Sequence, residues 1–217
     1  MANESLKQQV ATAALKYIKD DMTIGIGTGT TVHYFIEGLK NYRHRIDAVV
    51  ASSIDTQNKL KNVGIPVVEM TSVNQIDLYV DGADEVNPHK QLIKGGGGAL
   101  TREKIIAYNS KQFICIVDET KCVDILGQFP LPIEVIPMAR SIVARALVQL
   151  GGNPVYRENF ITDNQNIILD VNGLDIMQPI ALEGELNQIP GVVSNGLFAQ
   201  KTPQTVLVAK NNGITEV

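Results

Sequence analysis

Short apolar strands and amphipathic helices alternate along the first half of the chain, and this alternation limits the folds that are open to it. Apolar residues recur every three or four positions within residues 4–19 and again at Val32, Phe35, Ile36 and Leu39, as on one face of a helix. Strands that alternate with helices predict a mostly parallel, open sheet with helices on both faces. The expected strands are residues 22–26, 48–51, 65–68, 76–80 and 113–117. One further helix is expected to end near Leu60, and another to span residues 100–107.

The pattern changes after Pro130. The order of elements becomes β-α-β-β-α-β, which is the ferredoxin-like split unit. We therefore predict an α/β catalytic domain of residues 1–128 and 200–217 and a smaller ferredoxin-like α+β domain of residues 129–199. The last strand, residues 205–209, is expected to return to the first sheet. In the small domain the expected strands are residues 133–136, 155–157, 167–171 and 192–199, and the expected helices are 138–150 and 180–189.

Composition excludes several classes of function. The net charge of −4, the pI near 5.4 and the lack of a basic run argue against nucleic acid as a partner. No apolar stretch approaches the roughly 18 residues of a membrane span, and the first residues lack the pattern of a signal peptide. Cys115 lies in an apolar run, where a buried free thiol is typical. We expect a cytoplasmic protein with no membrane partner.

Acids, a lysine and four glycines follow the apolar strand 76–80. Asp81 and Asp84 come at the carboxyl end of that strand, where open α/β sheets bind ligands. Lys94 precedes glycines 95–98, whose uncovered N–H groups can wrap around an oxygen-rich ligand. A helix beginning at Leu100 directs its first-turn N–H groups toward the same space. This segment predicts a catalytic pocket for a small, oxygenated, anionic molecule.

Each of these features also has a simpler interpretation. Residues 81–85 are consistent with a solvated turn, and residues 94–98 with a flexible linker. Carboxylates also bind Mg²⁺ or Ca²⁺, but no EF-hand spacing follows and Lys94 opposes a cation. Glu103 alone is an ordinary first-turn helix acid. The succession of all these features within one strand–helix unit favours the pocket.

A second glycine-containing turn, GIGTGTT at residues 25–31, joins the strand 22–26 to a helix. A dinucleotide fingerprint requires glycine where Thr30 stands, and a P-loop requires a lysine after its last glycine. The hydroxyls of Thr28, Thr30 and Thr31 beside a helix N-terminus suit a phosphate or another anion. The alternative is an ordinary threonine N-cap. No Cys or His stands at ligand spacing, so we expect no metal site.

Four motifs together resemble type A ribose-5-phosphate isomerases. They are GIGTGTT at 25–31, DGADE at 81–85, KGGGGALTREK at 94–104 and FPLPIEVIPMAR at 129–140, and the similarity continues through 150–171 and 189–199. The resemblance implies interconversion of ribose 5-phosphate and ribulose 5-phosphate without a metal or an organic cofactor. It also implies an α/β domain with a smaller α+β domain inserted near the C-terminal end, and we expect a homodimer.

The resemblance also implies roles for individual residues. Glu103 is the base that moves the proton, and Lys94 and the N–H groups of residues 95–98 stabilise the enediolate. Asp81 and Asp84 hold sugar hydroxyls and assist ring opening or proton exchange between the oxygens. Thr31 and Lys121 are the expected phosphate contacts. The full set of expected substrate-binding residues is Lys7, Thr28, Gly29, Thr30, Thr31, Asp81, Gly82, Ala83, Asp84, Lys94, Gly95, Gly96, Gly97 and Lys121.

Two rival functions use similar features. A non-catalytic sugar-phosphate sensor could share the fold, but Glu103 has no evident purpose in simple binding and no DNA-reading module is attached. A nicotinamide-dependent dehydrogenase is disfavoured by Thr30 and by the lack of an acidic residue at the end of strand 48–51.

Overall fold

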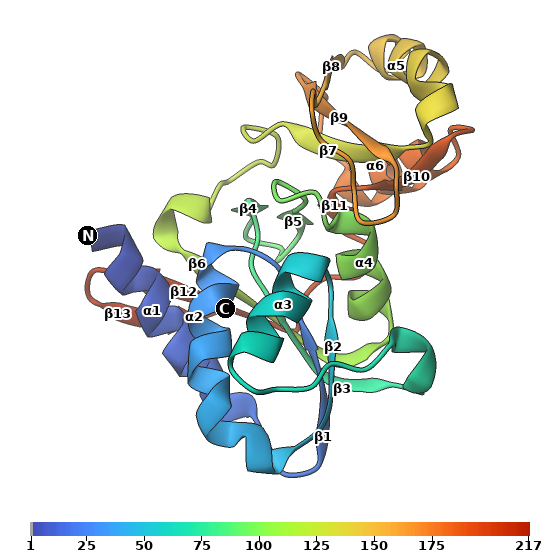
Figure 1. Ribbon diagram of the computed structural model, residues 1–217. Coiled ribbons are helices and arrows are strands. Elements are labelled where there is room, and N and C mark those ends of the chain that lie inside the picture. Colours follow the sequence, from blue (N-terminus) through green and yellow to red (C-terminus); the bar gives the residue numbers. More distant parts are fainter. Residues whose placement is uncertain (1) are drawn as a thin grey trace. The chain divides into compact units, whose positions relative to one another are not determined.

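The computed structural model describes residues 2–217, which form two compact units (Figure 1). The α/β unit contains the residues up to Ala83, Arg102–Lys121 and Pro203–Val217, and the α+β unit contains Asp84–Thr101 and Cys122–Thr202. This division follows the density of contacts, whereas a domain is a part of the chain that folds by itself. The predicted domain of residues 129–199 therefore stays a prediction.

A six-stranded sheet forms the centre of the α/β unit, in the order β13-β12-β6-β3-β1-β2. All neighbouring strands are parallel except β13, which runs antiparallel to β12 at the edge. The predicted return of the last strand to the first sheet is confirmed, because β12 pairs with β6. The strands are β1 Met22–Ile26, β2 Ile46–Ala51, β3 Ile76–Asp81, β6 Ser110–Asp118, β12 Thr205–Lys210 and β13 Gly213–Glu216.

Helices cover both faces of this sheet, as predicted. Alternate strand residues such as Ile24, Leu78 and Ile114 point to one face, where they share a core with the first three helices. On the other face Gly25 leaves room for Ile106 of the fourth helix, since a β-carbon there would lie 2.6 Å from its side chain. Figure 1 shows α1 and α2 side by side. The helices are α1 Ala2–Ala14, α2 Thr30–Leu39, α3 Ile54–Asn62 and α4 Leu100–Tyr108, with 3₁₀ turns at Leu15–Tyr17, Lys40–Arg45, Met70–Ser72 and Glu119–Lys121.

Two expectations about strands were wrong, and one edge strand was missed. Residues 65–68 form no strand, because Pro66 lacks the N–H that a ladder needs, and only Val68 donates to Val49 of β2. The edge strand β13 was missed because it is polar and mostly exposed, and Ile214 is its one large apolar side chain. The expected strand 192–199 divides at Gly196, where a β-carbon would overlap the carbonyl oxygen of Lys94.

The α+β unit contains the predicted β-α-β-β-α-β order. Its four-stranded sheet is antiparallel, in the order β10-β7-β9-β8, and its core joins Ile133, Val143 and Leu186 from a strand and both helices. A second sheet of three short strands has the order β11-β5-β4. The strands are β4 Glu85–Val86, β5 Leu92–Ile93, β7 Leu131–Val135, β8 Asn153–Tyr156, β9 Ile167–Asn172, β10 Val192–Asn195 and β11 Leu197–Phe198; the helices are α5 Arg140–Gln149, preceded by a 3₁₀ turn at Pro137–Ala139, and α6 Pro179–Asn187.

None of the helices in the described part of the chain combines the length and the apolarity that crossing a bilayer requires.

Tyr79 is the largest fully buried side chain and links the core of the α/β unit to a buried acid. Its ring lies 4.8 Å from the ring of Phe113, centre to centre, and its hydroxyl donates to Asp81 at the end of the same strand. Burial raises the pKa of the Tyr79 phenol well above its ordinary value of 10.0, and the negative charges of Asp81 and Glu103 raise it further. The phenol therefore stays protonated where an exposed tyrosine ionises.

We predict that Tyr79 makes the protein lose stability at alkaline pH. Above the pKa of an exposed tyrosine the unfolded chain binds fewer protons than the folded one, so the free energy of unfolding falls as pH rises and is unaffected by Tyr79 below that pH. The free energy of unfolding can be measured with urea at a series of pH values from neutral to strongly alkaline. Above the pKa of an exposed tyrosine it should fall with pH more steeply for the wild type than for Tyr79→Phe, by up to about 1.4 kcal/mol per pH unit.

Tyr108→Phe is the matched control, because Tyr108 is 82% exposed. Its unfolding free energy should follow the wild type throughout. Equal slopes for the wild type and Tyr79→Phe would contradict the prediction.

Candidate active site

The sheet of the α/β unit has a topological switch point between β1 and β3. From β1 the chain passes to β2 on one side, whereas β3 pairs with the opposite edge of β1. In open α/β sheets ligands bind outside the carboxyl ends of the strands at such a point. Gly27 follows the last residue of β1, and Asp81 is the last residue of β3. The polar residues at these two strand ends are therefore the first candidates for a site.

The carboxylate of Asp81 is fully buried and held by donors from three sides. The backbone N–H groups of Thr28 and Gly82 donate to Oδ1 over 3.1 and 2.7 Å, and the Tyr79 hydroxyl donates to Oδ2. A β-carbon at Gly27 would overlap this carboxylate, so only glycine fits there while Asp81 keeps its position. The arrangement provides the hydrogen bonds that a buried carboxylate needs.

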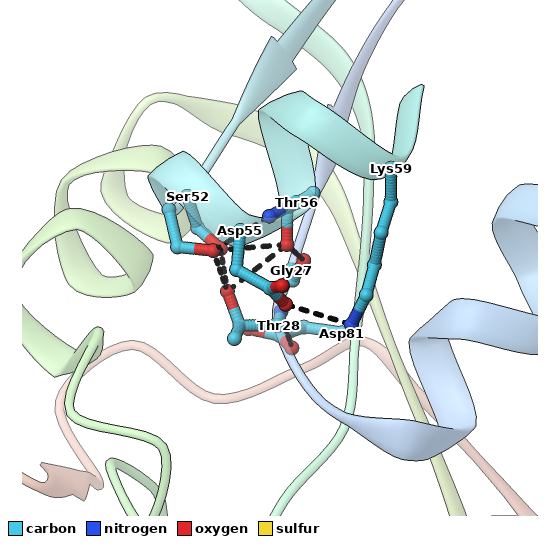
Figure 2. A network of polar contacts seen from close by, with 8 residues as sticks. Gly27, Thr28, Ser52, Asp55, Thr56, Lys59 and Asp81 are labelled. Carbon is cyan, nitrogen blue, oxygen red and sulfur yellow. Dashed lines mark hydrogen bonds and ion pairs between the residues drawn. The ribbon is translucent and has the colours of Figure 1, made fainter. Parts of the chain in front are cut away.

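The Thr28 side chain points toward α3 and away from the helix that follows it in the chain, as Figure 2 shows. Its Oγ1 lies 2.8 Å from Ser52 Oγ, donates to Ser53 Oγ over 2.9 Å and lies 3.2 Å from Thr56 Oγ1. Thr56 Oγ1 in turn donates to the carbonyl of Gly27 over 2.7 Å. The Thr28 hydroxyl thus fixes the turn after β1, and its backbone N–H serves Asp81.

The remaining residues of this turn begin α2. Gly29 is the N-cap, so the threonine N-cap considered from the sequence is not seen. Thr30 is exposed and Thr31 is half-buried, and both lie in the first helical turn, whose N–H groups have no partner within the helix. Lys7 Nζ donates to Thr30 Oγ1 over 2.9 Å. The structure therefore brings Lys7 of α1 to the N-terminus of α2, where an anion is favoured.

Two further predicted residues belong to the α/β unit. Glu103 lies in the first turn of α4 and is 4% exposed, and its charge contributes to the raised pKa of Tyr79. Lys121 is half-buried. It ends the 3₁₀ turn that begins directly after Asp118, the buried last residue of β6. Because β6 is parallel to β3, Asp118 and Asp81 end their strands at the same edge of the sheet.

The lysine–glycine segment belongs to the α+β unit. Lys94 is 2% exposed, its Nζ lies 5.5 Å from the centre of the Phe198 ring, and its N–H donates to the carbonyl of Gly196 over 2.9 Å. Gly95 and Gly98 adopt φ values of 103° and 80°, which favour glycine, and the Gly98 N–H closes a turn onto the Gly95 carbonyl over 2.9 Å. The segment is therefore an ordered turn and not a linker.

Two of the four glycine N–H groups already have acceptors within the α+β unit. The Gly96 N–H donates to Asp84 Oδ2 over 2.8 Å, and the Gly98 N–H is used within the turn. Among the described residues, the hydrogen bonds of this turn do not use the N–H groups of Gly95 and Gly97, so these two can donate to a ligand. The expectation that the N–H groups of residues 95–98 serve a ligand stays a prediction, and those of Gly95 and Gly97 suit it best because the other two are already bonded.

Side chains that the sequence analysis did not select hold this turn. Arg157, directly after β8, donates to the carbonyls of Gly95 and Gly96, and the Phe160 ring fills the space where a β-carbon of Gly98 would lie. The buried carboxylate of Glu134 on β7 accepts hydrogen bonds from Thr101 in the first turn of α4 and from Thr162, Asn164 and Asn166.

The predicted residues thus divide between the two units. The α/β unit contains Lys7, Thr28, Gly29, Thr30, Thr31, Asp81, Gly82, Ala83, Glu103 and Lys121, and the α+β unit contains Asp84, Lys94, Gly95, Gly96 and Gly97. Among the residues that were missed, Tyr79 had a signal, because side chains two positions apart on a strand share a face. Arg157 had none, because its partners depend on the pairing of β8 with β9.

No group of three or more His, Cys, Asp and Glu side chains in residues 2–217 could hold a metal ion.

Comparison with known proteins identifies the family. Residues 48–213 match the family model described as ribose 5-phosphate isomerase A (phosphoriboisomerase A). The chain is 58% identical to ribose-5-phosphate isomerase A of Legionella pneumophila strain Lens over 98% of both chains. A crystal structure of ribose 5-phosphate isomerase A from Neisseria gonorrhoeae is 42% identical, with a TM-score of 0.97 over 99% of this chain and 96% of that one.

A structure of D-ribose-5-phosphate isomerase in complex with phospho-erythronic acid is also 42% identical, with a TM-score of 0.96 over 100% of this chain and 99% of the other. The matches in sequence and in structure agree and extend over almost the whole chain. The chain therefore belongs to the ribose 5-phosphate isomerase A family of enzymes.

Proposed function

We propose that the protein interconverts D-ribose 5-phosphate and D-ribulose 5-phosphate, with Glu103 as the proton-transferring base and an enediolate as the intermediate. The observation that carries the proposal is a buried carboxylate in the first turn of α4, in a chain that belongs to this family. The reaction is the aldose–ketose isomerisation of the non-oxidative pentose phosphate pathway.

The chemistry requires one group that takes a proton and returns it. In the aldose the proton leaves the carbon next to the carbonyl, and in the ketose it is attached to the neighbouring carbon. A single carboxylate that faces both carbons can perform both transfers. Glu103 meets this requirement because a helix carries it and burial limits its motion. A simple sugar-phosphate sensor would not need such a group.

The enediolate carries negative charge that must be met by donors already in place. Lys94 and the N–H groups of Gly95 and Gly97 are the proposed donors. A relative that is 42% identical was solved in complex with phospho-erythronic acid. This compound ends in a planar carboxylate, which resembles the planar, oxygen-rich enediolate, so the complex supports a site that favours this intermediate.

Asp81 and Asp84 are the proposed contacts for sugar hydroxyls, and they assist ring opening or proton exchange between the oxygens. Both carboxylates are oriented by backbone N–H groups, Asp81 by Thr28 and Gly82 and Asp84 by Gly96. A carboxylate oriented in this way can accept hydrogen bonds from sugar hydroxyls through its remaining lone pairs. Gly82, Ala83, Thr28 and Gly29 are proposed to line the substrate through the same turns.

The phosphate is proposed to bind at the N-terminus of α2. Lys7 and Thr30 already contact each other there, and Thr31 and the first-turn N–H groups add further donors. Lys121 supplies a second positive charge at the same edge of the sheet. We further propose that the enzyme acts in the cytoplasm as a homodimer, without a metal or an organic cofactor; these properties rest on the family resemblance.

We predict that Glu103→Gln nearly abolishes turnover and leaves the affinity for substrate within roughly tenfold of the wild type, since glutamine keeps the shape but cannot accept the proton. Steady-state kinetics with ribose 5-phosphate and binding of phospho-erythronic acid measure the two effects. Glu185→Gln, on α6, is the control and should keep wild-type kinetics. Substantial turnover by a folded Glu103→Gln protein would falsify the assignment of the base.

Removal of the Lys94 side chain should lower kcat by about 10²-fold, the loss typical of one transition-state donor. Affinity for phospho-erythronic acid should weaken in the same variant, Lys94→Ala. Lys111→Ala is the control. Lys111 pairs with Asp77 on strand β3 of the α/β unit, so this variant should leave both quantities unchanged. A rise in KM alone would show that Lys94 binds substrate and transition state equally.

The phosphate contacts can be tested by comparing phosphorylated and free sugar. Thr31→Val and Lys121→Ala should each weaken binding of ribose 5-phosphate by about 1.5–3 kcal/mol, the worth of a charge-assisted hydrogen bond. Turnover of free ribose, measured with the same enzymes, should change much less. Thr12→Val and Lys61→Ala, both at exposed positions on helices α1 and α3, are controls of the same chemistry. Equal losses with both sugars would place Thr31 and Lys121 elsewhere in the mechanism.

A further inference from the structure

The guanidinium of Arg157 fixes two consecutive peptide groups of the glycine turn. Its Nη1 donates to the carbonyl of Gly95 over 3.3 Å and to the carbonyl of Gly96 over 3.1 Å. In a planar trans peptide the C=O of one residue and the N–H of the next point in opposite directions. The Gly96 N–H and the Gly97 N–H therefore both point away from Arg157. The first donates to Asp84, and the second is a donor that the turn itself does not use.

Arg157 is itself held in one orientation. Asp170 on β9 accepts from Nε over 2.8 Å and from Nη2, so the two planar groups form a fork. The guanidinium also lies 5.3 Å from the centre of the Phe160 ring, the side chain that occupies the space beside Gly98. The Arg157 and Asp170 side chains are only 19% and 22% exposed, which strengthens their interaction relative to a pair in water.

Such a support matters because the turn has little rigidity of its own. Glycine loses more backbone freedom on ordering than any other residue, and four stand in succession here. Donors stabilise a developing charge best when they need no rearrangement as the charge forms. A side chain that orders these peptide groups before substrate binds would therefore act on the rate and not on ground-state binding.

We propose that Arg157 is a positioning residue for the isomerisation, which aims the Gly97 N–H at the enediolate by holding the carbonyls of Gly95 and Gly96. The inference rests on the proposed function, because it assumes an enediolate intermediate. Asp170 contributes by holding the guanidinium of Arg157 in its orientation. Arg157 touches neither the reacting atoms nor the sugar in this mechanism.

Arg157→Lys is the sharpest test, because lysine keeps the positive charge beside Asp170 but cannot reach two carbonyls and a carboxylate with a planar fork. We expect kcat to fall by up to about 10²-fold, the effect of misplacing a catalytic group by about 1 Å. KM should stay within about threefold, because ground-state binding is unaffected. Phospho-erythronic acid should lose affinity by the same factor as kcat/KM.

Arg140→Lys is the matched control, because Arg140 lies in the same unit with its guanidinium 5.0 Å from the centre of the Tyr156 ring. It should keep the wild-type kcat. Arg157→Ala provides a second variant, in which added guanidinium should restore part of kcat by occupying the vacated position. Thermal unfolding of each variant shows whether it is folded.

The outcomes separate the two proposals. Wild-type kcat in folded Arg157→Lys, or a rise in KM with kcat unchanged, overturns the positioning role. If Glu103→Gln, assayed in parallel, is inactive while Arg157→Lys turns over normally, only the role of Arg157 fails. If Glu103→Gln keeps full activity, the proposed mechanism itself fails.

Discussion

The carboxylate of Asp81 occupies the space that a side chain at position 27 would need, and the edge of the α/β sheet is arranged around that close approach. A buried charge requires donors, and three different parts of the chain supply them: the turn after β1, the turn after β3 and the hydroxyl of Tyr79. Once these bonds form, the direction of the turn after β1 is fixed, and so is the start of α2. The network of hydroxyls around Thr28 then joins the end of β2 and the start of α3 to the same point (Figure 2).

The α+β unit solves a different problem, because its polar turn is made of glycines and has no side chains to fix it. Here the ordering groups come from elsewhere in the unit: a carboxylate at Asp84, a guanidinium at Arg157 and a ring at Phe160. The same ferredoxin-like sheet that supplies Arg157 also supplies Glu134, which fixes Thr101 at the start of α4. An ordinary small α+β fold thereby acts as the frame of the turn that we propose to be catalytic, through these contacts and not through its topology.

Periodicity and turn chemistry were sufficient to predict most of the fold. The strand Met22–Ile26 was predicted at its observed bounds, and the β-α-β-β-α-β order after Pro130 was predicted from apolar runs and glycine stops. The failures have physical causes: Pro66 removes a donor from an apolar run, Gly196 divides a continuous one, and β13 is too polar to resemble a strand. Motifs also identified the glycine turn and the acids, but not what holds them. Arg157 reaches the turn only through the pairing of β8 with β9, and single-sequence patterns do not contain such long-range pairings.

The space around Gly27 also has an evolutionary consequence. Gly98 must be glycine for two reasons, its φ of 80° and the ring of Phe160, so a smaller residue at position 160 would not release it. Gly27 is required by the Asp81 side chain, whose Cβ alone would lie 2.5 Å from a β-carbon there, and not by its own backbone conformation, which is open to any residue. Positions 27 and 81 should therefore change together among distant descendants of this fold: a side chain at position 27 becomes possible only in a lineage whose residue 81 is itself glycine or has moved, and the turn can then acquire a new ligand.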